Sequence, residues 1–466
     1  MSTMHPEQQT QPSTFSLQRL KKVNLKERAA PAIYGCFLYL MDLVTLGSRA
    51  FTDDPLNDVT GMMGISTLFF VMSCCISQLT FYGLSSFRVG LVSSPISESF
   101  FSIRKLYADI TTATEGLKMS TEETMSTVLF SLFLSTLLTG VAFLLLYCFN
   151  ANKILSAIPA EIGLSLFFVV GCFCYRFANA TVWSLSKTGY MNIAAFNATG
   201  VVLWLGCKLL SKKVPAISRY AYILCVAMLI GLFYLVAWAN SWTVEELRTL
   251  NLLPTNASKE LIKDWVVKVG LSKVRLDVVW GQILSILSIT LLNMIHFPIN
   301  IPAISKGTGS SCLMKKELLA NGVANCLSAF GGGFPTYLIS SSTIALNTPV
   351  RTKRIDTLVL GIAFPALFFI GRPLLYYTPQ LSFDILLLFV GLDILYGSFK
   401  EIYESGVYTM VFVSIVTATS LCFNNLQFGM AAGFLVFGTK AIHAKYMSRA
   451  AEEEDDDFVA VTIPMA

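Results

Sequence analysis

The chain has 466 residues, of which 54% are hydrophobic and only 14% are charged. Soluble domains carry about 25% charged residues. A chain this apolar cannot cover a soluble surface, but its side chains can face lipid at no cost. Length and composition therefore exclude a series of soluble domains and predict many membrane-spanning segments. The formal net charge of +5 bears on orientation, and the 11 cysteines include several within apolar runs, where they act as small core residues.

Apolar runs follow one another along most of the chain, and runs of about 17–25 residues are typical of spanning helices. About fourteen such segments are present, seven on each side of a long polar loop. They are Pro31–Gly47, Gly61–Leu84, Leu91–Ile103, Val128–Phe149, Ile158–Tyr175, Met191–Leu210, Tyr220–Asn240, Val278–His296, Cys312–Phe330, Phe334–Leu346, Leu358–Tyr376, Phe383–Gly397, Val407–Phe423 and Phe428–His443. The sequence thus predicts an all-α polytopic membrane protein.

Charge divides the chain further. Residues 1–28 form a basic arm, 29–240 the first half, 241–277 the polar loop, 278–446 the second half and 447–466 an acidic tail. Because cytoplasmic loops are enriched in Lys and Arg, the arm should be cytoplasmic. An even number of spans then places both termini in the cytoplasm of a multi-pass protein. The loop, which carries the sequon at Asn256, should be external or lumenal.

The third segment of each half is short and interrupted by Gly and Pro. The breaks fall at 88–98 and at 331–342, in matching places of the two halves. Such breaks indicate a midplane binding site, where two half-helix N-termini aim free N–H groups at a ligand. The alternative is that Gly and Pro only kink packed helices. The candidate substrate-binding residues are Ser93, Ser94, Glu98, Pro335, Thr336, Ser341 and Ser342.

Two stretches resemble a known family. Residues 317–335 are similar to the sulfate permease (SulP) signature ELIAQGLANIVSGLFGGIP, and 386–393 to its LLFVGLDLL. The resemblance implies a seven-plus-seven inverted repeat, in which a core domain of segments 1–4 and 8–11 moves against a gate domain. Substrate then binds between the third and tenth segments.

Three departures from the family pattern stand out. Typical members end in a cytoplasmic STAS domain, whereas about twenty residues follow the last predicted span, so we expect a transporter domain lacking STAS. The tenth segment has Ser342 where anion transporters often carry a basic residue. Residues 40–47 and 295–303 resemble a divergent fungal vacuolar subgroup, linked to proton-driven storage of basic amino acids.

Three ionisable residues lie in apolar surroundings: Asp42, Glu98 and His296. Charges at such depth are costly and usually face a cavity, and desolvated carboxylates or histidines can carry protons. These three are the candidate proton-coupling residues. Structural roles remain open: a hydrogen bond between helices for Asp42, pairing with Arg88 or Arg104 for Glu98, and an interface contact for His296.

The predicted function is secondary transport of a small polar solute, an anion such as sulfate by family resemblance, through elevator-like alternating access with proton coupling. The alternatives are proton-driven vacuolar transport of basic amino acids and a transport-inactive scaffold or sensor. No P-loop, GxSxG or HExxH motif is present, so an enzyme is not expected, nor is a metal or cofactor. The expected partners are the lipid bilayer and a small-molecule or ion substrate; a homodimer is left open, and nucleic acid is not expected.

Overall fold

The structure is a computed structural model, and the part described here excludes several terminal and loop segments. The described residues are 25–51, 62–87, 93–94, 97–150, 159–185, 190–214, 221–250, 252–254, 269–331, 333–347 and 353–459. Seven of their helices are long and apolar enough to cross a membrane, and two further apolar helices are shorter.

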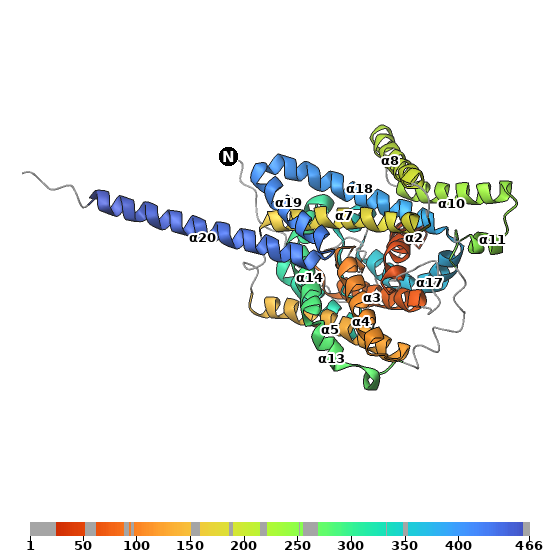
Figure 1. Ribbon diagram of the computed structural model, residues 1–466, viewed down its shortest axis with the longest axis horizontal. Helices are drawn as coiled ribbons and strands as arrows, with labels where there is room; N and C mark the ends of the chain where they lie inside the picture. Colours follow the sequence, from red (N-terminus) through yellow and green to blue (C-terminus); the bar gives the residue numbers. More distant parts are fainter. Residues whose placement is uncertain are drawn as a thin grey trace, which may run out of the picture.

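Fourteen of the described helices contain eight or more residues, seven before the polar loop and seven after it. The first seven are α2 (Leu25–Thr45), α3 (Met62–Leu84), α4 (Ser97–Gly116), α5 (Thr121–Cys148), α7 (Ala160–Leu185), α8 (Tyr190–Lys213) and α10 (Ala221–Ala239). The second seven are α14 (Ile283–Thr308), α15 (Met314–Gly331), α16 (Ser340–Asn347), α17 (Arg354–Tyr377), α18 (Gln380–Ser405), α19 (Val407–Cys422) and α20 (Leu426–Val459). The predicted polytopic helical fold is confirmed (Figure 1).

The two halves meet at a short antiparallel strand pair. Strand β1 (Ser93–Ser94) precedes α4, and β2 (Tyr337–Leu338) precedes α16. The two strands pair with Ser93 opposite Leu338 and Ser94 opposite Tyr337. Antiparallel pairing of equivalent segments is what two halves of opposite direction produce. We call this place the crossing.

Contacts between helices divide the bundle into two units. The core unit consists of α2–α5 and α14–α17, in which α15 packs against both α3 and α5, and α17 packs against α3 and α2. The gate unit consists of α7–α10 and α18–α20, in which α18 packs along α7 and α8, and α19 packs along α7 and α20. Fewer contacts join the units, and they lie between α4 and α7, α2 and α18, α14 and α7, and α4 and α20.

Glycines allow close helix contacts in each unit. A Cβ on Gly140 of α5 would lie 2.6 Å from the backbone nitrogen of Cys326 on α15. In the gate unit, a Cβ on Gly391 of α18 would lie 3.2 Å from the carbonyl oxygen of Gly171 on α7. Small residues at such interfaces let backbones approach, which drives helix association in lipid. Gly391 belongs to the family-like stretch 386–393, so this part of the motif has a packing role.

Glu317, at the start of the family-like stretch 317–335, anchors the end of α3. Its fully buried carboxylate accepts hydrogen bonds from the Ser85 hydroxyl at 3.0 Å and from the backbone N–H and hydroxyl of Ser86 at 2.6 Å each. The guanidinium of Arg354 donates to the carbonyl oxygens of Tyr82 and Gly83 at the same helix end. The last carbonyl groups of a helix have no partner within the helix, and Arg354 supplies a donor to two of them.

Three predicted boundaries are wrong. Helix α14 does not end at His296 but continues to Thr308 through Pro298 and Pro302, because neighbouring helices can satisfy backbone groups that proline frees. The last segment does not end at His443: α20 continues through the acidic residues 452–457 to Val459 and projects beyond the bundle (Figure 1). The third segment runs to Gly116 instead of ending near Ile103.

The polar loop is also more ordered than predicted. It contains α11 (Val244–Thr249), the 3-10 helix η3 (Leu271–Lys273) and the start of α13 (Leu276–Gly281). The Thr243 hydroxyl accepts the Glu246 N–H at 3.3 Å and the Glu246 carboxylate accepts the Thr243 N–H at 2.7 Å, a reciprocal capping box. Asn256 lies outside the described residues.

Candidate functional site: the crossing and the core–gate cavity

The crossing brings two helix N-termini together. Helix α4 begins three residues after β1, and α16 begins two residues after β2. Because the strands are paired, the first turns of both helices start from the same place and run away from each other. The free N–H groups and positive dipole ends of both helices therefore face one region, which favours an anion or a polar group. The residues predicted to bind substrate lie in and beside this strand pair.

The predicted substrate residues differ in what the structure shows of them. Pro335 and Thr336 are buried just before β2. The Thr336 hydroxyl is bonded to Ser77 of α3, and its N–H donates to the Asn325 side chain at 2.8 Å, so Thr336 fixes β2 to α3 and α15. Ser342 is half-buried on the first turn of α16. The side chains of Ser93, Ser94, Glu98 and Ser341 lie outside the described residues.

Three buried hydroxyls that sequence reasoning missed lie within the first two turns of the two half-helices. The side chains of Ser99 and Ser102 on α4 and of Thr343 on α16 are 0%, 4% and 0% exposed. None of the three hydroxyls has a hydrogen-bond partner among the described residues. Buried polar groups are normally hydrogen-bonded, so each is available to a ligand or to water. Their position after the breaks is the signal that could have found them.

Two of the candidate coupling residues, Asp42 and His296, lie on different helices of the core unit. Asp42 is half-buried on α2, within electrostatic range of Tyr39 and of Cys74 on α3, inside the core unit. His296 is fully buried in the middle of α14. Its ring lies 5.8 Å from the ring of Tyr337 on β2 and 5.5 Å from that of Phe167 on α7. His296 therefore joins the crossing to the gate unit. The Glu98 side chain is not among those described.

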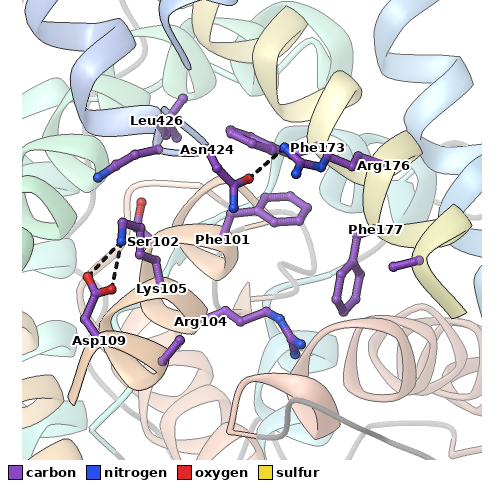
Figure 2. Close-up of a pocket in the computed structure, with 13 residues that line it drawn as sticks. Phe101, Ser102, Arg104, Lys105, Asp109, Phe173, Arg176, Phe177, Asn424 and Leu426 are labelled. Atoms are coloured by element: carbon purple, nitrogen blue, oxygen red, sulfur yellow. Dashed lines mark hydrogen bonds and ion pairs between the residues drawn. The ribbon is translucent and has the colours of Figure 1, made fainter. Parts of the chain in front are cut away.

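A cavity of about 400 Å³ lies between the core and gate units. We call it the vestibule; it is lined by Phe101, Ser102, Arg104, Lys105, Ala108 and Asp109 of α4, by Phe173, Arg176, Phe177 and Ala180 of α7, and by Asn424, Asn425 and Leu426 between α19 and α20. Figure 2 shows its cationic side chains: Arg176 donates to Asn424 at 3.0 Å, and Lys105 bonds to Asp109 at 2.8 Å. Three cations and one carboxylate make the vestibule electropositive, and clefts of this kind concentrate anions.

A buried ion pair crosses the boundary between the units next to the vestibule. Arg49 belongs to the 3-10 helix η1 (Gly47–Arg49), directly after α2, and Asp384 belongs to α18. The Arg49 Nη1 atom lies 2.7 Å from the Asp384 Oδ1 atom, and the side chains are 2% and 0% exposed. Neither residue was selected from the sequence, because their partnership joins positions 335 residues apart.

A second, very small cavity separates this ion pair from the crossing. It is apolar and is lined by residues on either side of Arg49, including Gly47 and Ala50, together with Phe100 of α4 and Phe334 next to β2. Among the described residues, no group of three His, Cys, Asp or Glu side chains is arranged to hold a metal ion. The chemistry that this arrangement offers is binding of a charged or polar solute between two packed units.

Two inverted helical halves whose broken segments meet inside the core unit, beside a second packed unit, define a polytopic membrane transporter. Comparison with known proteins agrees. The model of the sulfate permease family matches residues 154–415, more than half of the chain. The chain belongs to the sulfate permease family.

The solved structures that resemble this fold are also transporters. The transmembrane domain of a cyanobacterium bicarbonate transporter, BicA, is 13% identical, with a TM-score of 0.54, covering 89% of this chain and 99% of that one. The murine anion transporter Slc26a9 in its inward-facing state is 13% identical, with a TM-score of 0.59, covering 94% of this chain and 74% of that one. At this identity the likeness establishes the fold and says nothing of the substrate.

One curated relative has a described solute. The vacuolar basic amino acid transporter VSB1 of Saccharomyces cerevisiae is 24% identical over an alignment of 383 residues, which covers 78% of this chain and 36% of that protein. The chain thus spans about a third of the length of this relative. Both the family and the structural relatives are transporters rather than enzymes.

Proposed function

We propose that the protein is a secondary transporter of a small anion, and that the anion passes from the vestibule to the crossing. The electropositive vestibule carries this proposal. Arg104, Lys105 and Arg176 line the space between the units, against the single carboxylate of Asp109. A cationic solute would be repelled there, whereas an anion would be concentrated. The cavity of about 400 Å³ admits an ion of the size of sulfate together with water.

The binding position proposed for the anion is the crossing. Helix N-termini bind oxyanions through free N–H groups, and the α4 and α16 termini converge there. The hydroxyls of Ser99, Ser102 and Thr343 can donate hydrogen bonds to oxyanion oxygens, as can Ser342 on the same turn of α16. Ser93, Ser94 and Ser341 are proposed as further donors, and Pro335 as the residue that keeps the backbone of the break open.

Transport in this proposal is a displacement of the core unit relative to the gate unit. The glycine-mediated contacts α5–α15 and α7–α18 lie within the units and hold each one rigid. The contacts between the units are sparser, so this boundary is where sliding costs least. The vestibule would then open toward one side of the membrane and close as the core moves.

We further propose that both termini are cytoplasmic, from the predicted distribution of Lys and Arg. The vestibule, which includes the turn between α19 and α20, then opens to the opposite side. Coupling to protons is proposed for Asp42, His296 and Glu98. His296 supports this role, since it is fully buried between β2 of the core unit and α7 of the gate unit.

A second candidate function is transport of basic amino acids. Two observations favour it: the similarity to VSB1 and the half-buried carboxylate of Asp42 on α2. A basic amino acid carries a carboxylate that fits the helix N-termini and an ammonium or guanidinium that fits Asp42. The cationic vestibule argues against this candidate.

The test is uptake of labelled sulfate into proteoliposomes containing the wild-type protein, Arg104→Gln or Arg176→Gln. Both substitutions should lower the initial rate at low ionic strength, and salt should reduce the difference, because steering by charge is screened. Lys208→Gln is the control, since Lys208 pairs with Asp393 at 2.5 Å on the exposed side of the gate unit and should leave the rate unchanged. Unchanged rates in both arginine variants, or arginine uptake in place of sulfate, would contradict the proposal.

A further inference from the structure

We propose that the Arg49–Asp384 ion pair holds the core and gate units together and that the Arg49 guanidinium, bound here by the Asp384 carboxylate, is an anion-binding group of the transport site. We call this ion pair the lock. An anion arriving from the vestibule replaces the Asp384 carboxylate on the Arg49 guanidinium and thereby releases the two units from each other. This inference rests on the proposed anion transport and names the residue that confers it. Neither residue belongs to the two breaks or to the family-like stretches 317–335 and 386–393.

The first step of the argument is the position of the pair. Arg49 follows α2 of the core unit, and Asp384 lies on α18 of the gate unit. The atoms Nη1 and Oδ1 are 2.7 Å apart, a charge-assisted hydrogen bond within a part of the protein from which water is excluded. Any displacement of one unit along the other must pull these atoms apart.

The second step is that separating Arg49 from Asp384 without a replacement partner is unfavourable. Splitting a buried ion pair leaves two charges without compensation in a medium of low dielectric constant. The units can therefore separate only if another anion takes the place of the carboxylate on Arg49 and water or a cation reaches Asp384. A guanidinium suits this exchange, since its planar fork of donors fits carboxylates and tetrahedral oxyanions alike.

The third step is that Arg49 lies between the vestibule and the crossing. Its guanidinium carbon is 5.9 Å from the centre of the Phe177 ring, and the Arg104 guanidinium lies 4.6 Å from the same ring. Figure 2 shows Arg104 extending across the vestibule below Phe177. Arg104 also donates to the carbonyl oxygen of Arg49 at 3.1 Å. On the other side, Gly47 and Ala50 line the small cavity that ends at Phe334, next to β2.

The two arginines thus form a path of positive charge across one aromatic ring. An anion held first at Arg104 needs to move past Phe177 to reach Arg49, and from there the helix N-termini of the crossing are the next positive groups. The Asp384 carboxylate occupies the position on the Arg49 guanidinium that the transported anion would take, and so acts as an internal competitor of the substrate.

The test measures concentration-dependent sulfate uptake for the wild type, Arg49→Gln, Asp384→Asn and the swapped pair Arg49→Asp/Asp384→Arg. Asp384→Asn removes the internal competitor, so the KM for sulfate should fall. Loss of one charge-assisted hydrogen bond to the competing carboxylate corresponds to a fall in KM of about ten- to a hundredfold. Arg49→Gln should lose sulfate uptake. The swapped pair restores opposite charges but moves the guanidinium to the gate unit, so it should insert without transporting sulfate.

Asp393→Asn is the matched control, because Asp393 is an exposed carboxylate on the same helix and pairs with Lys208. Its KM should equal that of the wild type. Arg49→Gln with normal uptake, a swapped pair with normal uptake, or an Asp384→Asn KM equal to that of Asp393→Asn would each overturn the lock. If Arg49→Gln fails to insert, the KM of Asp384→Asn still decides. A wild type that takes up sulfate while these variants behave normally refutes only the lock, whereas a wild type that takes up no sulfate refutes anion transport as well.

Discussion

Glu317 offers a sharp test of how the core unit is held together. Its carboxylate is fully buried and accepts hydrogen bonds from Ser85 and from two groups of Ser86, the latter at 2.6 Å each. A hydrogen bond to a charged group contributes about 1.5–3 kcal/mol, so loss of the two short bonds should cost about 3–6 kcal/mol in Glu317→Ala. Partial rehydration of Ser86, which is half-buried, places the expected loss near the lower end, about 3 kcal/mol.

Glu317→Gln should be milder. The amide oxygen still accepts the Ser86 N–H, while the amide nitrogen faces hydroxyls that can rotate to accept from it, so the expected loss is about 1–2 kcal/mol. The assay is equilibrium unfolding of the purified protein in mixed micelles of mild detergent and dodecyl sulfate. Glu404→Ala is the matched control: its carboxylate is 63% exposed and lies 3.8 Å from Lys400, a surface pair worth about 0–1 kcal/mol.

The reasoning would be refuted by a Glu317→Ala loss no larger than that of Glu404→Ala. It would also be refuted if Glu317→Gln destabilised the protein as much as Glu317→Ala, because the charge alone would then be responsible and the acceptor geometry would not matter.

Three further predictions address the gate unit, the loop and proton coupling. Gly391→Leu should destabilise the protein by about 1–3 kcal/mol through overpacking against α7. Gly397→Ala on the same helix, where a Cβ would meet nothing within 4 Å, should stabilise it by about 0.5–1 kcal/mol. Equal effects of the two variants in thermal unfolding would contradict the packing argument. The hydrogen bonds from Thr243 hold the pKa of Glu246 below its usual range, so this carboxylate stabilises α11 above its unfolded pKa and the contribution is lost as pH falls through the folded pKa. Hydrogen exchange of residues 244–249, corrected for its intrinsic pH dependence, should therefore rise in acid in the wild type but not in Glu246→Gln, and identical profiles would disprove the capping role. Asp42→Asn should abolish accumulation driven by a pH gradient while the protein still inserts, and normal transport at pH 5 to 8 would show that this carboxylate is structural.

Much of the fold could be predicted from the sequence, because lipid imposes a simple rule on apolar runs. The fourteen segments, the two breaks and the division at the polar loop all follow from length and hydropathy. Two of the errors arose where the apolar run ends before the helix does. Prolines 298 and 302 interrupt the run in α14 and the charges at 452–457 follow the run in α20, whereas both helices continue through these residues. In α14, packing against neighbouring helices can satisfy the backbone carbonyl groups that the two prolines leave without a partner.

The site was less predictable than the fold. The breaks located the crossing, but the ion pair between Arg49 and Asp384 depends on the approach of two units and leaves no mark in either local sequence. The vestibule is similar, since its basic residues come from α4 and α7 and become a cluster only when the core meets the gate. Asp42 stood out because it interrupts an apolar run; Arg49 follows the end of that run and looks like an ordinary interfacial charge.

The most direct test of anion transport is a side-by-side uptake measurement on the wild-type protein in proteoliposomes, with labelled sulfate and labelled arginine, each with and without an imposed pH gradient. The electropositive vestibule and the paired helix N-termini predict saturable uptake of sulfate that the gradient stimulates, and no uptake of arginine above that of empty liposomes. Gradient-driven uptake of arginine without uptake of sulfate would contradict the account and would assign the site to a cationic solute.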